Sequence, residues 1–181
     1  MARLSKNRRR LPHPCAHPLK PDRRARHFSL VWIGRSSRRF SAMNRRRPRG
    51  LSSRPLVLIV DDHDDTCDLY VTGLAAFGFE AIAASDCAQA YRRARDSHPD
   101  IVVTDLTLGG ANGWQLVQDL KRETRTRNIP VVVLTRHAAP SLRARAEREG
   151  CAAFVLKPCL PDELATELRQ VLDRATARRA S

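Results

Sequence analysis

The sequence lacks any apolar run that approaches the roughly 20 residues needed to span a membrane. It also lacks a CxxC pair, although it holds five cysteines, four of which fall within or beside expected helices and strands. The missing pairs argue against a disulfide framework, and the positions suit buried free thiols in a reducing compartment. These absences predict a soluble protein of the cytoplasm.

Acidic residues are almost absent from residues 1–54, which hold 17 Lys and Arg against one acid, Asp22. Residues 55–181 hold 16 Lys and Arg against 18 acids, so the formal charge of +14 divides into +16 and −2. Residues 1–54 are also poor in aliphatic side chains, which predicts a disordered Arg/Pro-rich tail. We expect one folded domain over 55–176 and a frayed end over 177–181.

The tail leaves three interpretations open. It can be an arm that binds polyanions, an Arg-rich and acid-poor targeting peptide, or a solvated extension without a role of its own. The only methionine after Met1 is Met43, so a start there would remove residues 1–42 and leave the folded domain whole. Whether residues 1–42 belong to the native protein is therefore open.

Short apolar runs alternate with helix-length segments from residue 55 onward. Strands are expected at 56–60, 79–84, 101–104, 131–135 and 154–156, and helices at 66–77, 87–97, around 114–120, 141–149 and 161–175. Asp64 or Asp65 is expected to cap the first helix, and Asp86 the second. Largely β-branched runs of this length predict strands buried on both faces, as in a parallel sheet covered by helices. Five such units predict an α/β, flavodoxin-like (βα)5 fold, a doubly wound parallel sheet with strand order 2-1-3-4-5.

Polar residues follow the strands at their carboxyl ends: Asp61-Asp62, Asp105, Thr135 and Lys157. Strands 1 and 3 are neighbours in the predicted order, so the three carboxylates are expected to lie together, where ligands bind in such sheets. Three carboxylates a few ångströms apart repel one another unless a cation joins them or some are protonated. A hard divalent cation, Mg²⁺, is the natural solution, and phosphate oxygens complete its ligand shell.

The same edge has the groups needed to receive a phosphoryl group. Asp105 can act as a nucleophile and form an acyl phosphate. Lys157 offsets charge on the phosphoryl oxygens, and the Thr135 hydroxyl can donate a hydrogen bond to one of them.

This ordered set resembles the response-regulator receiver domain of two-component signalling, over about residues 55–175. The matching segments are Val60-Asp61-Asp62, Val103-Thr104-Asp105-Leu106, Gly113, Leu134-Thr135 and Phe154-Val155-Leu156-Lys157-Pro158. The departures from the family pattern are Arg136 and His137 after the threonine, and Gly109 where the family often has proline. The large Arg136 side chain can either hinder a phosphodonor or pair with phosphoryl oxygens.

The resemblance implies a role for each matching residue. Asp105 is implied as the phospho-acceptor, with Asp62 and Asp105 as direct Mg²⁺ ligands, Asp61 as a ligand through water and the Thr107 backbone carbonyl as a further ligand. Thr135 and Phe154 are implied as a switch pair, in which the hydroxyl moves toward the phosphoryl group and the ring turns inward. A cis peptide is implied at Lys157-Pro158, which proline permits.

The function expected from the resemblance is a stand-alone signalling switch. Asp105 takes a phosphoryl group from a phosphohistidine of a sensor histidine kinase or histidine phosphotransfer protein, and no effector domain is expected after Lys157. Output is expected through contacts with a downstream protein or a second copy of the chain, near Arg143, Arg145, Glu147 and Glu163. We expect no enzymatic activity beyond its own phosphorylation and dephosphorylation.

Two other classes of function compete with this one. In the first, the chain is a nucleic-acid-associated regulator whose basic tail binds polyanions while the folded domain modulates that binding. In the second, the fold serves as a scaffold independent of phosphorylation. The full set of reactive residues argues against the scaffold, because contacts alone do not require them.

Overall fold

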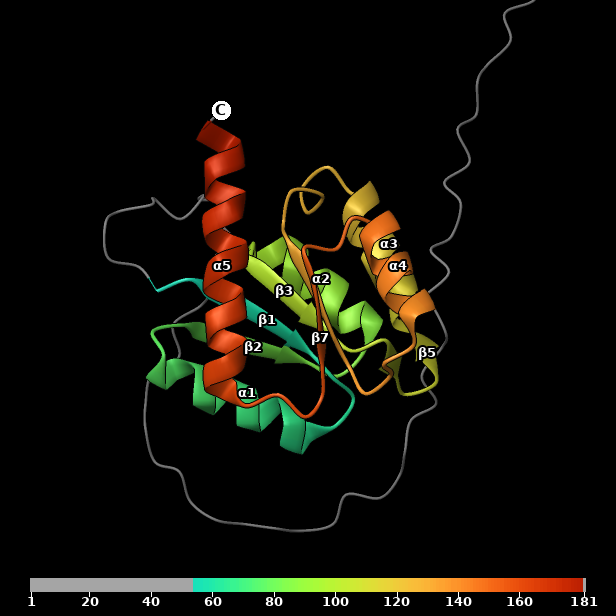
Figure 1. The fold of residues 1–181 in the computed structure, drawn as a ribbon, viewed down its shortest axis with the longest axis horizontal. Coiled ribbons are helices and arrows are strands. Elements are labelled where there is room, and N and C mark those ends of the chain that lie inside the picture. The colour runs from blue at the N-terminus through green and yellow to red at the C-terminus, as the bar shows by residue number, and fades with distance from the viewer. Residues whose placement is uncertain (1–53, 181) are drawn as a thin grey trace, which may run out of the picture. The chain divides into compact units, whose positions relative to one another are not determined.

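The computed structural model describes residues 54–180, so the expected tail and its possible roles lie outside the described residues, apart from Arg54. Five parallel strands form one sheet (Figure 1). They are β1 (Leu56–Val60), β2 (Glu80–Ala84), β3 (Ile101–Thr104), β6 (Val131–Thr135) and β7 (Ala153–Leu156). Their order in space is β2-β1-β3-β6-β7, which confirms the predicted doubly wound, flavodoxin-like arrangement.

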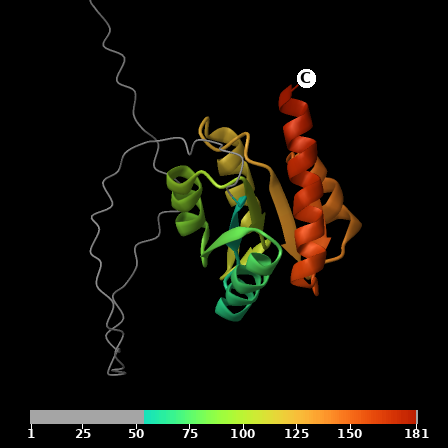
Figure 2. The same ribbon diagram turned by 90° about the vertical axis from the view of Figure 1, so that its left-hand side faces the viewer.

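Helices connect the strands and cover the sheet in two layers (Figures 1 and 2). They are α1 (Asp64–Ala76), α2 (Cys87–Ser97), α3 (Gly113–Arg122), α4 (Pro140–Arg148) and α5 (Pro161–Ala180). Helices α1 and α5 pack on each other, as do α2 and α3. Within residues 54–180, no helix combines the length and the apolar character needed to cross a membrane.

The central strands are buried on both faces, as their continuous apolar runs predict. Every residue of β1, β3 and β6 is buried. Alternate residues point to opposite faces, so Val57 and Ile59 join the core beneath α1 and α5, while Leu58 and Val60 face the other helical layer. Because both faces of the sheet are covered by helices, polar side chains lie at the ends of the strands.

One predicted helix end is confirmed and two differ from the prediction. Asp86 caps α2 as expected, its side chain accepting a hydrogen bond of 2.7 Å from the Gln89 N–H. Neither Asp64 nor Asp65 caps α1, because the helix already begins at Asp64 and its N-cap is His63, whose own N–H is held by the Asp61 carboxylate. Helix α5 continues to Ala180, beyond the end expected near residue 175.

A short hairpin between β3 and α3 was not predicted. It pairs β4 (Thr107–Leu108) with β5 (Ala111–Asn112) in antiparallel fashion, and two glycines make the turn. Gly109 and Gly110 have φ of 55° and 84°, a left-handed conformation that glycine adopts at little cost. Gly113 begins α3 against the backbone of the segment that follows β3, since a Cβ there would lie 2.4 Å from the Asp105 carbonyl oxygen.

A buried phenol ties α1 to the loop between β7 and α5. The Tyr70 hydroxyl donates a hydrogen bond of 2.8 Å to the Cys159 carbonyl, far away in the sequence. Burial raises the pKa of Tyr70 from 10.0 to about 12, and burial likewise raises the pKa of the Cys159 thiol from 9.0 to about 11. The folded chain therefore holds these protons more strongly than the unfolded chain does.

Tyr70→Phe should flatten part of the alkaline unfolding profile. Because the pKa of Tyr70 is raised on folding, its contribution to stability is complete below pH 10 and is lost as the pH rises from 10 to 12. The variant should lose about 1 kcal/mol at neutral pH, from the missing hydrogen bond, and should be the more stable protein by pH 12, because the wild type loses about 3 kcal/mol over this range. Urea unfolding at stepped pH values checks this. Parallel pH profiles for the two proteins would contradict it.

Candidate functional site

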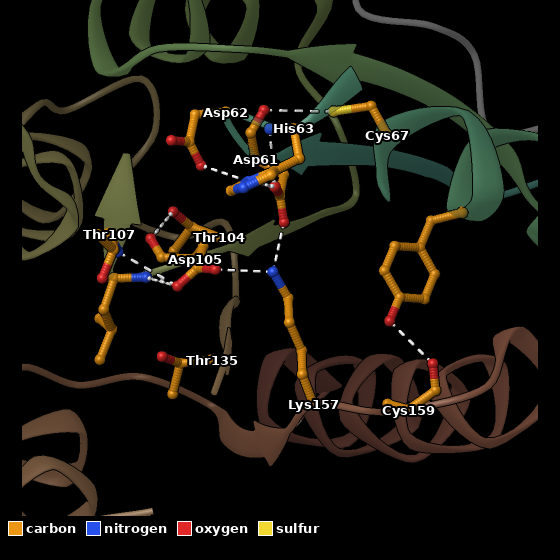
Figure 3. A network of polar contacts seen from close by, with 12 residues as sticks. Asp61, Asp62, His63, Cys67, Thr104, Asp105, Thr107, Thr135, Lys157 and Cys159 are labelled. Carbon is orange, nitrogen blue, oxygen red and sulfur yellow. Dashed lines mark hydrogen bonds and ion pairs between the residues drawn. The ribbon is translucent and has the colours of Figure 1, made fainter. Parts of the chain in front are cut away.

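The carboxyl ends of four strands supply the polar residues of the site (Figure 3). Asp61 follows β1, Asp105 follows β3, Thr135 ends β6 and Lys157 follows β7. Parallel pairing places Val60 beside Thr104, and the Asp105 N–H donates to the Val60 carbonyl at 2.9 Å. The register of the sheet therefore brings the two carboxylates that follow these strands to the same edge, as the sequence predicts.

Lys157 bridges the two buried carboxylates. Its Nζ lies 2.5 Å from Asp61 Oδ2 and 2.7 Å from Asp105 Oδ2. The two aspartates are only 2% and 8% exposed, and the lysine side chain is 9% exposed. Burial alone would lower the pKa of Lys157, but the hydrogen bonds and charges of Asp105 and Asp61 raise it above its usual value. The ammonium therefore stays charged between the two acids at neutral pH.

The second oxygen of Asp105 is held by the loop that follows β3. Oδ1 accepts hydrogen bonds from the N–H groups of Leu106, at 2.6 Å, and Thr107, at 3.2 Å. With Oδ2 on Lys157, both oxygens have fixed partners, and the carboxylate is held in one orientation. An oriented carboxylate loses less entropy when it reacts, which suits it to act as a nucleophile.

Asp62 points toward the hairpin. Its Oδ2 accepts a hydrogen bond of 2.8 Å from the Gly109 N–H, a donor that proline at this position would lack. Burial raises the pKa of Asp62, but the hydrogen bond from Gly109 and the adjacent His63 outweigh it and hold the pKa below its usual value. This partly exposed carboxylate is therefore ionised and accessible at neutral pH.

His63 also belongs to the site. Its imidazole is 56% exposed, as expected for a loop residue, yet Nδ1 lies 3.3 Å from Asp61 Oδ1 and 3.0 Å from Asp62 Oδ1. The only signal for this contact in the sequence is the position directly after the acidic pair. That position also serves as the N-cap of α1, which turns the side chain back over the carboxylates.

Thr135 and Phe154 lie on the neighbouring strands β6 and β7, and their side chains point to the same face of the sheet. Thr135 is fully buried, and its Oγ accepts a long hydrogen bond of 3.4 Å from the His137 N–H. Phe154 pairs with Val133, two residues before Thr135, so the side chains of all three point to one face of the sheet. The Phe154 ring is partly exposed and lies under the Arg143 guanidinium of α4, at 5.1 Å. Their switching remains a prediction.

The donor atoms fit a hard divalent cation. Asp61, Asp62 and His63 each offer one ligand atom, and these atoms lie within 4.8 Å of one another. The site holds three carboxylates against one ammonium, so two negative charges are in excess. Oxygen ligands and excess negative charge are what Mg²⁺ requires. Asp105 and Thr107 lie beside this group, linked by the hydrogen bond between them.

The structure also shows the peptide that the resemblance implied. Lys157-Pro158 is cis. The Lys157 N–H donates to the Thr135 carbonyl at 2.9 Å, which joins the ends of β6 and β7 directly at the site. Of the predicted site residues, Asp61 and Asp105 both contact Lys157. Asp62 and Thr107 lie beside them on the segments that follow β1 and β3. Thr135 lies at the end of β6, next to β7.

Solved structures show the same fold. The receiver domain of a putative LuxO repressor protein from Vibrio parahaemolyticus superposes with a TM-score of 0.63 at 23% identity, covering 70% of this chain and 96% of that one. NtrX from Brucella abortus gives a TM-score of 0.65 at 28% identity, covering 70% of this chain and 28% of that one.

Among curated proteins, the phosphate regulon transcriptional regulatory protein PhoB of Escherichia coli K12 is 32% identical over 118 residues, which are 65% of this chain and 52% of PhoB. The polar-differentiation response regulator DivK of Brucella ovis is 31% identical over 102 residues, 56% of this chain and 83% of DivK. This chain thus spans about half the length of PhoB. The model of the response regulator receiver domain matches residues 57–169, and the chain belongs to that family.

Membership of the family gives the site its general function. The folded part of this chain is a receiver domain of two-component signalling, and its acidic cluster is a pocket of the kind that binds Mg²⁺ in such domains.

Lys157→Met should destabilise the protein by about 3 kcal/mol, because it leaves two buried carboxylates without their cation. Adding Mg²⁺ should restore part of the loss. Urea unfolding with and without Mg²⁺ measures both effects.

Lys121→Met is the matched control for this experiment. Burial lowers the pKa of Lys121, whose Nζ donates a hydrogen bond of 3.1 Å to the Ile129 carbonyl. Its replacement should cost less than about 1 kcal/mol and should not respond to Mg²⁺. Equal losses in the two variants, or no effect of Mg²⁺ on Lys157→Met, would contradict the bridging role.

Proposed function

We propose that this chain is a phosphorylation-dependent signalling switch in which Asp105 accepts a phosphoryl group from a phosphohistidine. The donor is a sensor histidine kinase or a histidine phosphotransfer protein, the partners with which receiver domains interact. The observation that carries the proposal is the bridge from Lys157 to Asp61 and Asp105 at the carboxyl edge of the sheet. A fold used only as a scaffold has no need of such an arrangement.

Asp105 is the nucleophile in this proposal. One of its carboxylate oxygens attacks phosphorus, a P–O bond forms, and the P–N bond to the donor imidazole breaks with its electron pair passing to the departing nitrogen. The product is an acyl phosphate on Asp105. The N–H groups of Leu106 and Thr107 and the ammonium of Lys157 hold the carboxylate for this attack.

Two further residues, Lys157 and Thr135, interact with the phosphoryl group on Asp105. Lys157 lies 2.7 Å from Asp105 and, with its raised pKa, remains charged to offset the phosphoryl oxygens. Thr135 Oγ acts as acceptor in its contact with His137, so its own hydroxyl hydrogen can be donated to a phosphoryl oxygen. Movement of Thr135 gives Phe154, on the same face, room to turn inward.

Asp61, Asp62, Asp105 and the Thr107 backbone carbonyl hold Mg²⁺ in this proposal. The ion, when bound, offsets the negative charge of the phosphoryl oxygens. Asp62 is suited to recruit it, because its lowered pKa keeps it ionised and it is the most exposed of the three carboxylates. The hydrogen bond from Gly109 orients that carboxylate within the site.

Output passes to a downstream protein, or to a second copy of the chain, through α4, β7 and α5. Arg143, Arg145, Glu147 and Glu163 lie on these helices. The chain's own chemistry is limited to its phosphorylation and dephosphorylation. A nucleic-acid-associated role is the second candidate, favoured by the +16 charge of residues 1–54 and by the similarity to PhoB, a transcriptional regulatory protein.

Asp105→Asn should abolish phosphorylation. Incubation of the wild type with Mg²⁺ and a small phosphodonor should add one phosphoryl group, which intact mass spectrometry detects. The modification should not occur when Mg²⁺ is chelated. Asp96→Asn, an exposed carboxylate of α2, is the matched control and should be modified like the wild type. Equal modification of Asp105→Asn would remove Asp105 from the proposed role.

A further inference from the structure

Helix α4 is weakly anchored to the rest of the domain. Only one of its side chains, Ala146, is buried. Two arginines hold it instead, each with its guanidinium over an aromatic ring: Arg143 over Phe154 of β7 at 5.1 Å, and Arg145 over Trp114 of α3 at 4.6 Å. A helix with so little buried apolar surface shifts at small cost, so these two contacts matter for its position.

The two aromatic partners differ in their surroundings. Trp114 is buried at the start of α3. Phe154 is only partly buried and stands on the face of the sheet that carries the Thr135 side chain. An inward turn of the Phe154 ring would carry it away from α4 and out of reach of Arg143. The contact with Arg143 is therefore available to the outward ring alone.

We propose that Arg143 is a positioning residue, which holds the Phe154 ring in its outward position and so opposes occupancy of the Asp105 site by a phosphoryl group. The inference rests on the proposed function, because it acts through the Thr135 and Phe154 pair. Arg143 is exposed on α4, so it makes this contact without belonging to the reacting groups. Arg143 thereby sets the equilibrium between the outward and inward positions of the Phe154 ring.

The size of the effect follows from the contact. An arginine over an aromatic ring at an exposed site contributes about 0.5–1 kcal/mol, which corresponds to about a two- to five-fold change in an equilibrium constant. If only the outward ring has this contact, removing it favours the inward ring by that factor. A ligand that needs the inward ring then binds more tightly by the same factor, up to the limit at which that state is fully populated.

The experiment measures the affinity of the full chain for beryllofluoride, a phosphoryl mimic, by calorimetry in the presence of Mg²⁺. Arg143→Gln should bind about two- to five-fold more tightly than the wild type. Arg143→Lys, which keeps a cation, should lie between the two. In a Phe154→Leu background Arg143→Gln should have no effect, because the ring that it acts on is missing.

Arg148→Gln is the matched control, since it removes the same charge from the same helix at an exposed position. It should leave the affinity at the wild-type value. An equal gain in Arg148→Gln would attribute the effect to the charge of α4 and would overturn the assignment to Phe154.

A second measurement follows the ring itself. In protein labelled with fluorinated phenylalanine, the ¹⁹F resonance of Phe154, assigned by its loss in Phe154→Leu, should move toward its beryllofluoride-bound position in ligand-free Arg143→Gln. An unchanged resonance together with unchanged affinity overturns the inference while the proposed function stands. Binding of beryllofluoride that is the same in Asp105→Asn overturns the proposed function, and this inference with it.

Discussion

The rest of the site depends on one interaction, the ammonium of Lys157 between the buried carboxylates of Asp61 and Asp105. Two acids so little exposed do not remain charged side by side without a cation. The fold provides that cation from β7, which is separated from β1 by the two strands β3 and β6, and parallel pairing brings it to the same edge. Even so, Asp62 leaves the cluster with excess negative charge, which favours the binding of a divalent cation there.

The same sheet edge links the reacting groups to the surface. A backbone hydrogen bond between Lys157 and Thr135 joins the ends of β6 and β7, so a displacement of one strand end shifts the other. Phe154 lies on β7 and touches α4, a helix held by few buried contacts. Under the proposed function, a small rearrangement at the site would move this helix without disturbing the core, which is the physical requirement for a switch.

Much of this structure could be predicted from its apolar runs and the polar residues that follow them. Strands β1, β3 and β6 are buried on both faces, so they can be recognised in the sequence as continuous aliphatic segments. The parallel pairing of β1 with β3 brings Asp61 and Asp105 together. The hairpin of β4 and β5 escaped prediction because strands of two residues have no period to detect. The contact of His63 with Asp61 escaped because it depends on where the first helix begins, and helix starts are poorly determined by residue type alone.

The most direct test of the account is the free energy of unfolding of the full chain as a function of Mg²⁺ concentration. Because the folded site gathers the carboxylates and the unfolded chain does not, stability should rise with Mg²⁺, approaching about 1.4 kcal/mol for each tenfold increase once the site is nearly saturated. In Asp62→Asn, which keeps the Lys157 bridge but has one carboxylate fewer, most of this rise should disappear. A stability that ignores Mg²⁺, or one that responds equally in Asp62→Asn, would show that the acidic cluster does not hold a cation and would contradict the account.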